Sequence, residues 1–141
     1  MKVLIFGLAN TGKSYLSSLI KNNTNQTIAY FNADEIRAKY DDWDFSDAGR
    51  KRQAQRAVDF GSQDADIILW DFICPFKAAR EALGADAVIW MNTNSSSKYG
   101  DTDAVFEKPD ECDLEITSDM WWSDVATQET LNLVLNLITR T

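Results

Sequence analysis

At 141 residues and a formal net charge of −8, the chain is long enough for a single domain over residues 1–141, and too acidic for a broad electrostatic contact with nucleic acid. No stretch approaches the ~20 apolar residues of a membrane span, and the first residues lack the pattern of a signal peptide, so we expect a cytoplasmic protein with no membrane contact. The chain has no histidine, which leaves carboxylates for proton transfer, and Cys74 and Cys112 lack the spacing of metal ligands, so both should be buried thiols.

The first fourteen residues combine an apolar strand with a phosphate-binding loop. Residues 2–6 are a short apolar run, and residues 7–14 follow the pattern G-x-x-x-x-G-K-S. The two glycines let backbone N–H groups point at phosphates, Lys13 reaches the terminal phosphates, and the Ser14 hydroxyl is a Mg²⁺ ligand. The pattern predicts binding of ATP and Mg²⁺ by Gly7, Leu8, Ala9, Asn10, Thr11, Gly12, Lys13 and Ser14.

The rest of the chain alternates predicted strands and helices. Apolar or alternating runs predict further strands over residues 27–31, 66–71, 87–91 and 112–116. Helices are predicted from about residue 13, over 35–39 with Asp34 able to cap it, over 47–61, over 75–83 opened by Pro75, and after Ser123, where Val125, Leu131, Val134, Leu135 and Ile138 should pack on the sheet. This order predicts the three-layer α/β fold of P-loop NTPases, with a five-stranded, mostly parallel sheet of strand order 2-3-1-4-5 and the fifth strand at an edge.

Polar residues follow several predicted strands at their carboxyl ends, where ligands bind in such sheets. Asp34 is a candidate to orient or deprotonate a hydroxyl group, and a plain helix cap is the alternative. Asp71 is a candidate metal ligand, acting through a water molecule. Residues 92–104, rich in Asn, Ser and Gly, are predicted to form a short lid-like loop at the same edge.

Three arginines are candidates to bind an anionic acceptor. The guanidinium groups of Arg37, Arg50 and Arg56 can each bind phosphate or sulfate through two hydrogen bonds. The alternative is a solvated helix face that balances the acidic residues at 41, 42, 44 and 47. The chain has no guanine-reading N-K-x-D segment and is short for a motor or transport ATPase, so the sequence favours a small-molecule kinase.

Four segments resemble the adenylyl-sulfate (APS) kinases, in that family's order. Residues 32–37 are similar to its D-G-D-N-[IV]-R segment, residues 45–50 to F-S-x-x-D-R, residues 72–76 to F-I-S-P-Y and residues 106–109 to Y-E-x-P. The resemblance implies a P-loop kinase that uses ATP and Mg²⁺ to phosphorylate a hydroxyl of adenylyl sulfate, with Lys13 and Asp34 in catalysis. The acceptor-binding residues that it implies are Asp34, Arg37, Phe45, Arg50, Arg56, Phe72, Ile73 and Phe106.

The chain also departs from this family. Asn32, Glu35 and Gly49 stand where the family has Asp, Asn and Asp, and residues 92–104 are shorter than the family's basic lid. The acceptor therefore stays open between adenylyl sulfate and another hydroxyl compound, such as a modified pyrimidine nucleotide or base, a sugar acid or an antibiotic. A nucleotide-binding module without transfer activity is the alternative from another class. The expected partners are ATP and a small acceptor, an acceptor carried on DNA is disfavoured by the acidic charge, and a homodimer is left open.

Overall fold

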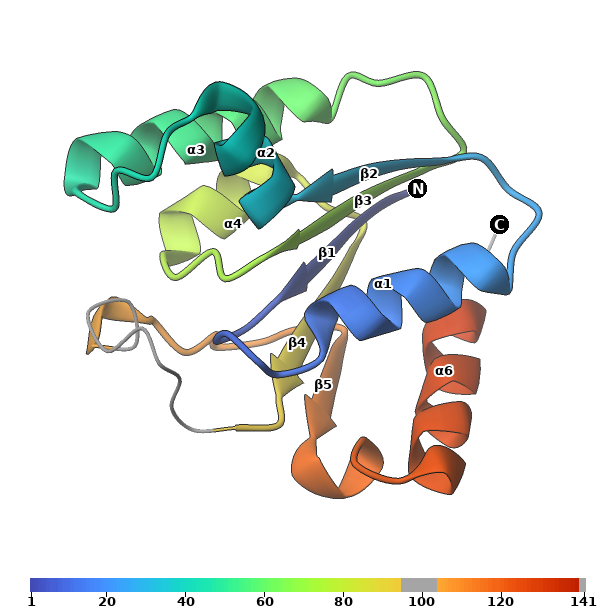
Figure 1. Ribbon diagram of the computed structural model, residues 1–141. Coiled ribbons are helices and arrows are strands. Elements are labelled where there is room, and N and C mark those ends of the chain that lie inside the picture. Colours follow the sequence, from blue (N-terminus) through green and yellow to red (C-terminus); the bar gives the residue numbers. More distant parts are fainter. Residues whose placement is uncertain (95–103, 140–141) are drawn as a thin grey trace.

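A five-stranded parallel sheet with helices on both faces forms the domain (Figure 1). The computed structural model describes residues 1–94 and 104–139. In spatial order the strands are β2 (Ile28–Asn32), β3 (Ile67–Phe72), β1 (Lys2–Phe6), β4 (Ala87–Asn92) and β5 (Leu114–Thr117). Every neighbouring pair of these strands is parallel, so the predicted order 2-3-1-4-5 and the edge position of the fifth strand are confirmed.

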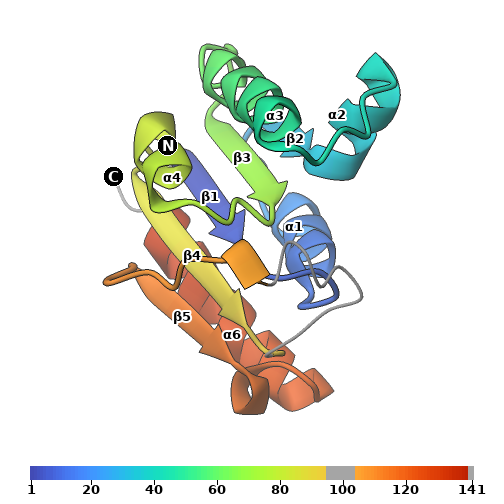
Figure 2. The ribbon, with the colours of Figure 1, turned by 90° about the vertical axis from the view of Figure 1, so that its left-hand side faces the viewer.

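The central strands divide the core into two layers. The helices are α1 (Lys13–Asn22), α2 (Ala33–Tyr40), α3 (Asp47–Phe60), α4 (Lys77–Leu83) and α6 (Asp124–Ile138), with a 3₁₀ helix, η1 (Ser118–Met120), before α6. Val3 and Ile5 of β1 pack with residues of α1 and α6 on one face, whereas Leu4 and Phe6 pack with residues of α3 and α4 on the other. Figure 2 shows the two helical layers on either side of the sheet.

The carboxyl ends of the strands bring the candidate residues to one edge. β1 leads into the phosphate-binding loop, β2 leads directly into α2, and β3 leads into the turn before α4. Asn32, the last residue of β2, pairs in register with Asp71 of β3, and Asp71 also pairs with Ile5 of β1. The ends of three adjacent strands therefore meet where a parallel α/β sheet binds its ligand.

Two predicted helix starts are wrong. The side chain of Asn32 accepts a hydrogen bond from the Glu35 backbone N–H at 3.0 Å, so Asn32 caps α2 and Asp34 does not. Pro75 does not open α4, which begins at Lys77. The Pro75 carbonyl instead accepts a hydrogen bond from the Glu107 N–H at 2.8 Å. This bond ties the turn after β3 to the segment that precedes β5.

Two burial predictions are also wrong. Val125 is 71% exposed: it lies six residues before Leu131, which places it about 120° around the helix from the buried stripe of α6. Cys74 is buried as predicted, but Cys112 is only partly buried because β5 begins two residues after it, at Leu114. In the ranges 1–94 and 104–139, no helix is long and apolar enough to cross a membrane.

Candidate functional site

Two glycines shape the loop between β1 and α1. Gly7 and Gly12 have φ values of +152° and +101°, which residues with a Cβ rarely adopt. A Cβ on Gly7 would lie 2.5 Å from the carbonyl oxygen of Met91, and one on Gly12 would lie 2.2 Å from Nε1 of Trp121. The loop is therefore enclosed by the end of β4 on one side and by Trp121 on the other.

Lys13, the first residue of α1, turns its side chain back over this loop. Its Nζ donates to the carbonyl oxygen of Leu8 at 2.7 Å, and the same oxygen accepts from the Thr11 hydroxyl at 2.8 Å. Burial lowers the pKa of Lys13 to about 8, and the negative charges of Asp71 and Asp34 oppose that shift. A cation thus lies beside the N-terminus of α1, which is the local chemistry that binds phosphate.

The first residues after β4 are tied to the same loop. The Thr93 hydroxyl donates to the carbonyl oxygen of Thr11 at 2.8 Å, and the Asn94 amide donates to that of Asn10 at 2.8 Å. Residues 95–103, most of the predicted lid over 92–104, lie outside the described residues, so the lid stays a prediction.

One carboxylate oxygen collects three donors beside the loop. Oδ2 of Asp71 accepts hydrogen bonds from the hydroxyl of Ser14 at 2.8 Å, the hydroxyl of Tyr30 at 2.5 Å and the amide of Asn32 at 3.3 Å. Burial and the bond to Asp71 raise the pKa of Tyr30 to about 12, so its hydroxyl remains a donor near neutral pH. The sequence does not mark Tyr30 as a site residue, because an aromatic residue in a strand fits the same pattern whether it packs in the core or binds a ligand.

Ser14 and Asp71 fit a magnesium site. Mg²⁺ in nucleotide sites takes one or two protein oxygens and completes its octahedron with water and substrate phosphates. The Ser14 hydroxyl and the Asp71 carboxylate are 2.8 Å apart at the start of α1, so both oxygens lie next to the predicted phosphate position. They are the residues that would hold the ion.

A cavity of about 980 Å³ extends from the phosphate loop to α3 and α4. Its volume is that of a small-molecule pocket. The predicted site residues that line it are Ala9, Asn10, Gly12, Lys13, Ser14, Asp34, Arg37, Phe45, Arg50, Asp71, Phe72 and Ile73. The far wall is built from small and apolar side chains of α3 and α4, among them Ala54, Val58, Ala78, Ala79 and Ala82.

Asp34 lies in the first turn of α2 and is exposed to this cavity. Its negative charge favours the protonated forms of both Lys13, in the phosphate loop, and Arg37, on α2. Because Asn32 caps the helix, the Asp34 carboxylate does not serve as the cap. It is therefore placed between the phosphate loop and the cationic side chains of the cavity.

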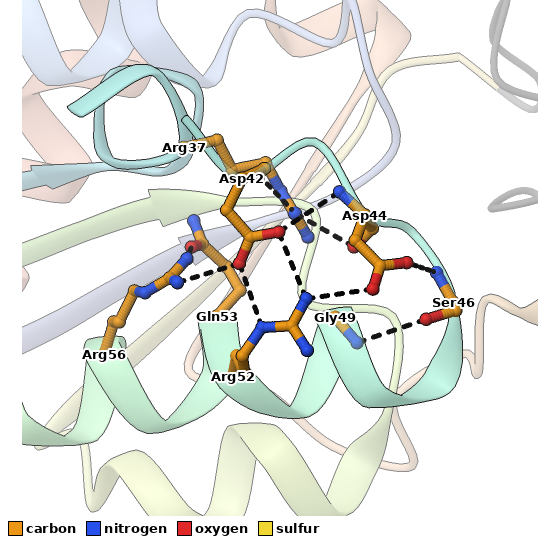
Figure 3. A network of polar contacts seen from close by, with 8 residues as sticks. All are labelled: Arg37, Asp42, Asp44, Ser46, Gly49, Arg52, Gln53 and Arg56. Carbon is orange, nitrogen blue, oxygen red and sulfur yellow. Dashed lines mark hydrogen bonds and ion pairs between the residues drawn. The ribbon is translucent and has the colours of Figure 1, made fainter. Parts of the chain in front are cut away.

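Arg37 is built into the wall of the cavity. It is only 5% exposed, and its Nη1 donates to the carbonyl oxygens of Asp42 at 3.0 Å and Asp44 at 3.2 Å (Figure 3). Its guanidinium carbon also lies 4.4 Å from the centroid of the Phe45 ring. Arg37 and Phe45 thus form one surface, in which the arginine supports the aromatic ring.

Arg56 does not line the cavity with the other predicted residues. Its Nη2 is 2.8 Å from Oδ2 of Asp42, its Nη1 donates to Oε1 of Gln53 at 3.1 Å, and its guanidinium lies over the ring of Tyr40. Gln53 does line the cavity and is buried, and its amide donates to the carbonyl oxygen of Ala33 at 3.0 Å. Arg56 therefore contacts the lining of the cavity through Gln53.

Phe106 also lies outside the cavity lining. Its ring stacks on that of Phe6, with centroids 6.2 Å apart, and the Arg80 guanidinium lies over both rings. Arg80 donates from Nε to the carbonyl oxygen of Cys74 at 2.8 Å and from Nη2 to that of Glu107 at 2.5 Å. This cluster therefore holds the turn after β3 in place and is not part of the cavity lining.

Comparison with known protein structures identifies the fold. No family model matches the sequence, and no match is found among curated proteins. Over 99% of its length the chain is similar to the APS kinase of Mycobacterium tuberculosis in complex with AMPPNP and APS, with 20% identity, a TM-score of 0.79 and 97% of that chain covered. It has the P-loop kinase fold.

Other P-loop kinases share this fold at lower identity. A shikimate kinase from Aquifex aeolicus has 13% identity and a TM-score of 0.65, with 99% of this chain and 100% of that chain covered. A gluconokinase from Sinorhizobium meliloti 1021 has 12% identity and a TM-score of 0.68, with 99% of this chain and 91% of that chain covered. In this P-loop kinase fold the phosphate loop and Asp34 share one cavity at the carboxyl edge of the sheet.

Proposed function

We propose that this protein is a kinase that transfers the γ-phosphate of ATP to a hydroxyl group on a small, anionic, nucleotide-like acceptor. The observation that carries the proposal is the cavity of about 980 Å³ that Lys13 and Ser14 of the phosphate loop line together with Asp34, Arg37 and Arg50. Transfer requires the triphosphate and the acceptor oxygen to be held in line within one enclosed space. We place the activity in the cytoplasm, which supplies ATP and keeps thiols such as Cys74 and Cys112 reduced.

Each residue at the site has a role in this reaction. Lys13 and the N-terminus of α1 stabilise the charge on the β- and γ-phosphates. Asp34 orients the acceptor hydroxyl and takes its proton as the oxygen bonds to the γ-phosphorus and the bond to ADP breaks. When bound, Mg²⁺ neutralises charge that develops between the β- and γ-phosphates. Ser14 and Asp71 are the residues that would hold it.

Adenylyl sulfate is the leading acceptor. Two of the four segments that resemble APS kinases, residues 32–37 and 45–50, supply Asp34, Arg37, Phe45 and Arg50, and all four residues line the cavity. An aromatic ring backed by a guanidinium group suits a nucleobase, and arginines suit the phosphosulfate group. The likeness to an APS kinase in complex with APS, at a TM-score of 0.79, supports the same choice.

Another hydroxyl compound is the second candidate. Gly49 stands where APS kinases carry Asp, and a Cβ there would lie 1.9 Å from the carbonyl oxygen of Asp44. The structure therefore has no room at position 49 for the Asp side chain that the APS kinases carry there. This favours an acceptor that differs from adenylyl sulfate in the part that would lie near Phe45, such as a modified pyrimidine nucleotide or base, a sugar acid or an antibiotic.

A thermal-shift panel followed by product analysis tests the proposal. A true acceptor stabilises the folded protein by mass action, by about 2.7 kcal/mol at 100 times its Kd, so the compound that raises Tm in the presence of Mg-AMPPNP identifies the class. Radiolabelled ATP should then give labelled acceptor. Slow ATP hydrolysis that no candidate stimulates would instead support a nucleotide-binding module without transfer activity, and would overturn the proposal.

A further inference from the structure

The segment between α2 and α3, residues 41–46, reaches the cavity through Phe45, and we call this segment the acceptor wall. It contributes the Phe45 ring, which is 47% exposed and lines the cavity. Ser46 caps α3 with its hydroxyl, so the wall leads without a break into the helix that carries Arg50. The contacts that hold this wall decide how Phe45 and Arg50 are presented.

Asp42 joins the acceptor wall to α3. Its carboxylate accepts from Nε and Nη2 of Arg52 at 3.1 and 3.2 Å, and from Nη2 of Arg56 at 2.8 Å (Figure 3). It also accepts from the backbone N–H of Asp44 at 3.2 Å, which fixes the turn of the wall itself. The Asp42 side chain is 11% exposed, against 48% for Arg52, so the acid is the enclosed centre of this network.

A second set of contacts runs from Asp42 into the cavity. The backbone carbonyl of Asp42 accepts from Arg37, and the Arg37 guanidinium supports the Phe45 ring at 4.4 Å. Arg37 and Phe45 both line the cavity. Any movement of residue 42 away from α3 would therefore displace Arg37 and Phe45, which form the surface that an acceptor would contact.

The first turn of α3 leaves the acceptor wall no room to shift inward. A Cβ at Gly49 would lie 1.9 Å from the carbonyl oxygen of Asp44, so the wall packs directly on the helix backbone. The Asp44 carboxylate also accepts hydrogen bonds, at Oδ2 from Nη2 of Arg52 at 2.9 Å and at Oδ1 from the Ser46 N–H at 2.9 Å. The wall is thus ordered by contacts within the protein.

We infer that Asp42 is a positioning residue for the acceptor: its ion pairs with Arg52 and Arg56 hold residues 41–46 so that Phe45 and Arg37 are ordered before the acceptor binds. This rests on the proposed function. Ordering the wall in advance lowers the entropy cost of binding, which is the usual gain from preorganisation. It also means that Arg52 and Arg56 already have acidic partners within the protein, Arg56 in Asp42 and Arg52 in Asp42 and Asp44, and do not depend on the acceptor anion for one.

Hydrogen exchange tests the structural half of this inference. In Asp42→Asn, the backbone amides of residues 44, 46 and 49 should exchange at least about tenfold faster, because charge-assisted bonds that hold the wall are lost, while exchange in α1 stays unchanged. The matched control is Asp110→Asn, which removes an ion pair with Lys77 at a side chain that is 87% exposed. Unchanged exchange in residues 41–49 of the Asp42 variant would overturn the inference.

Calorimetry tests the functional half. Protein loaded with Mg-AMPPNP is titrated with adenylyl sulfate. Asp42→Asn should weaken adenylyl sulfate binding about tenfold and leave the affinity for AMPPNP unchanged, and Asp42→Glu should restore part of the loss. Equal weakening of both ligands, or of neither, would overturn the positioning role. If the wild-type protein does not bind adenylyl sulfate, the named acceptor fails and the exchange measurement alone decides the role of Asp42.

Discussion

The hydroxyl of Tyr30 donates a 2.5 Å hydrogen bond to Oδ2 of Asp71, the same oxygen that accepts from the hydroxyl of Ser14 at 2.8 Å. Tyr30 lies on β2 and Asp71 on β3, strands that pair in parallel. The bond joins an edge strand to one of the two residues that we propose would hold a magnesium ion beside the phosphate loop. Tyr30 therefore fixes the orientation of the Asp71 carboxylate.

Tyr30→Phe should weaken the Mg²⁺-dependent part of nucleotide binding. Loss of a hydrogen bond to a charged group is worth about 1.5 kcal/mol or more, so the gain in AMPPNP affinity on adding Mg²⁺ should fall about tenfold. Affinity measured with EDTA should not change. Calorimetry with and without Mg²⁺ makes the comparison, and Tyr40→Phe, at a residue that is 54% exposed on α2, is the control. An equal loss with and without Mg²⁺ would assign Tyr30 a purely structural role.

The sheet and the phosphate loop could be predicted because their signals are local. The apolar run before Gly7 and the glycine spacing lie within fourteen residues, and alternating strands and helices leave few ways to wind a parallel sheet. The contact between Tyr30 and Asp71 could not be predicted from the sequence, because it depends on the register of β2 against β3. That register places Asn32, two residues after Tyr30, beside Asp71.

The arginines show the same limit at the acceptor end. The sequence allows Arg56 either to bind an anion or to balance nearby acids, and the structure pairs it with Asp42. Arg37 lines the cavity, yet it also donates to two backbone carbonyls of the wall. Residue type and helical spacing give the charge and the face of an arginine, but its partner is set by how the loop before α3 folds back.

Lys13→Met should stabilise the folded protein near neutral pH while abolishing nucleotide binding. Burial lowers the pKa of Lys13 from 10.5 to about 8, so between these values the unfolded chain binds more protons at this residue and the free energy of unfolding rises with pH. Below pH 8 the full cost of the buried charge remains, at most about 3 kcal/mol.

The pH-dependent part of the difference in unfolding free energy between this variant and wild type should therefore be largest at pH 7 and vanish by about pH 10.5. Urea unfolding at a series of pH values measures it, because contributions from other residues cancel in the difference. Lys108→Met, at an exposed position, should show no such pH dependence. A difference that does not change with pH would mean that Lys13 carries no charge penalty in the folded state.

Gly49→Ala should destabilise the protein by about 2–3 kcal/mol, although alanine normally favours a helix over glycine by about 1 kcal/mol. The reason is space: the new methyl would meet the Asp44 carbonyl at 1.9 Å, and a backbone oxygen cannot rotate away as a side chain can. Gly84→Ala is the contrasting control, because Gly84 has φ +62° and nothing within 4 Å of an added Cβ. It should cost only about 1 kcal/mol, from backbone strain. A thermal melt of both variants decides, and a stabilised Gly49→Ala would show that the wall yields.

Asp34→Asn should separate transfer from binding. Removing a group that orients and deprotonates the acceptor hydroxyl lowers the rate of phosphoryl transfer by about 10²- to 10⁴-fold, while the phosphate loop still binds nucleotide. Glu35→Gln is the matched control: it neutralises the neighbouring acid in the same turn of α2, yet Glu35 does not line the cavity. Single-turnover transfer from radiolabelled ATP gives the rate, and AMPPNP titration gives the affinity. If both variants lost transfer equally, the effect would come from the charge of the helix N-terminus, and Asp34 would have no specific part in the reaction.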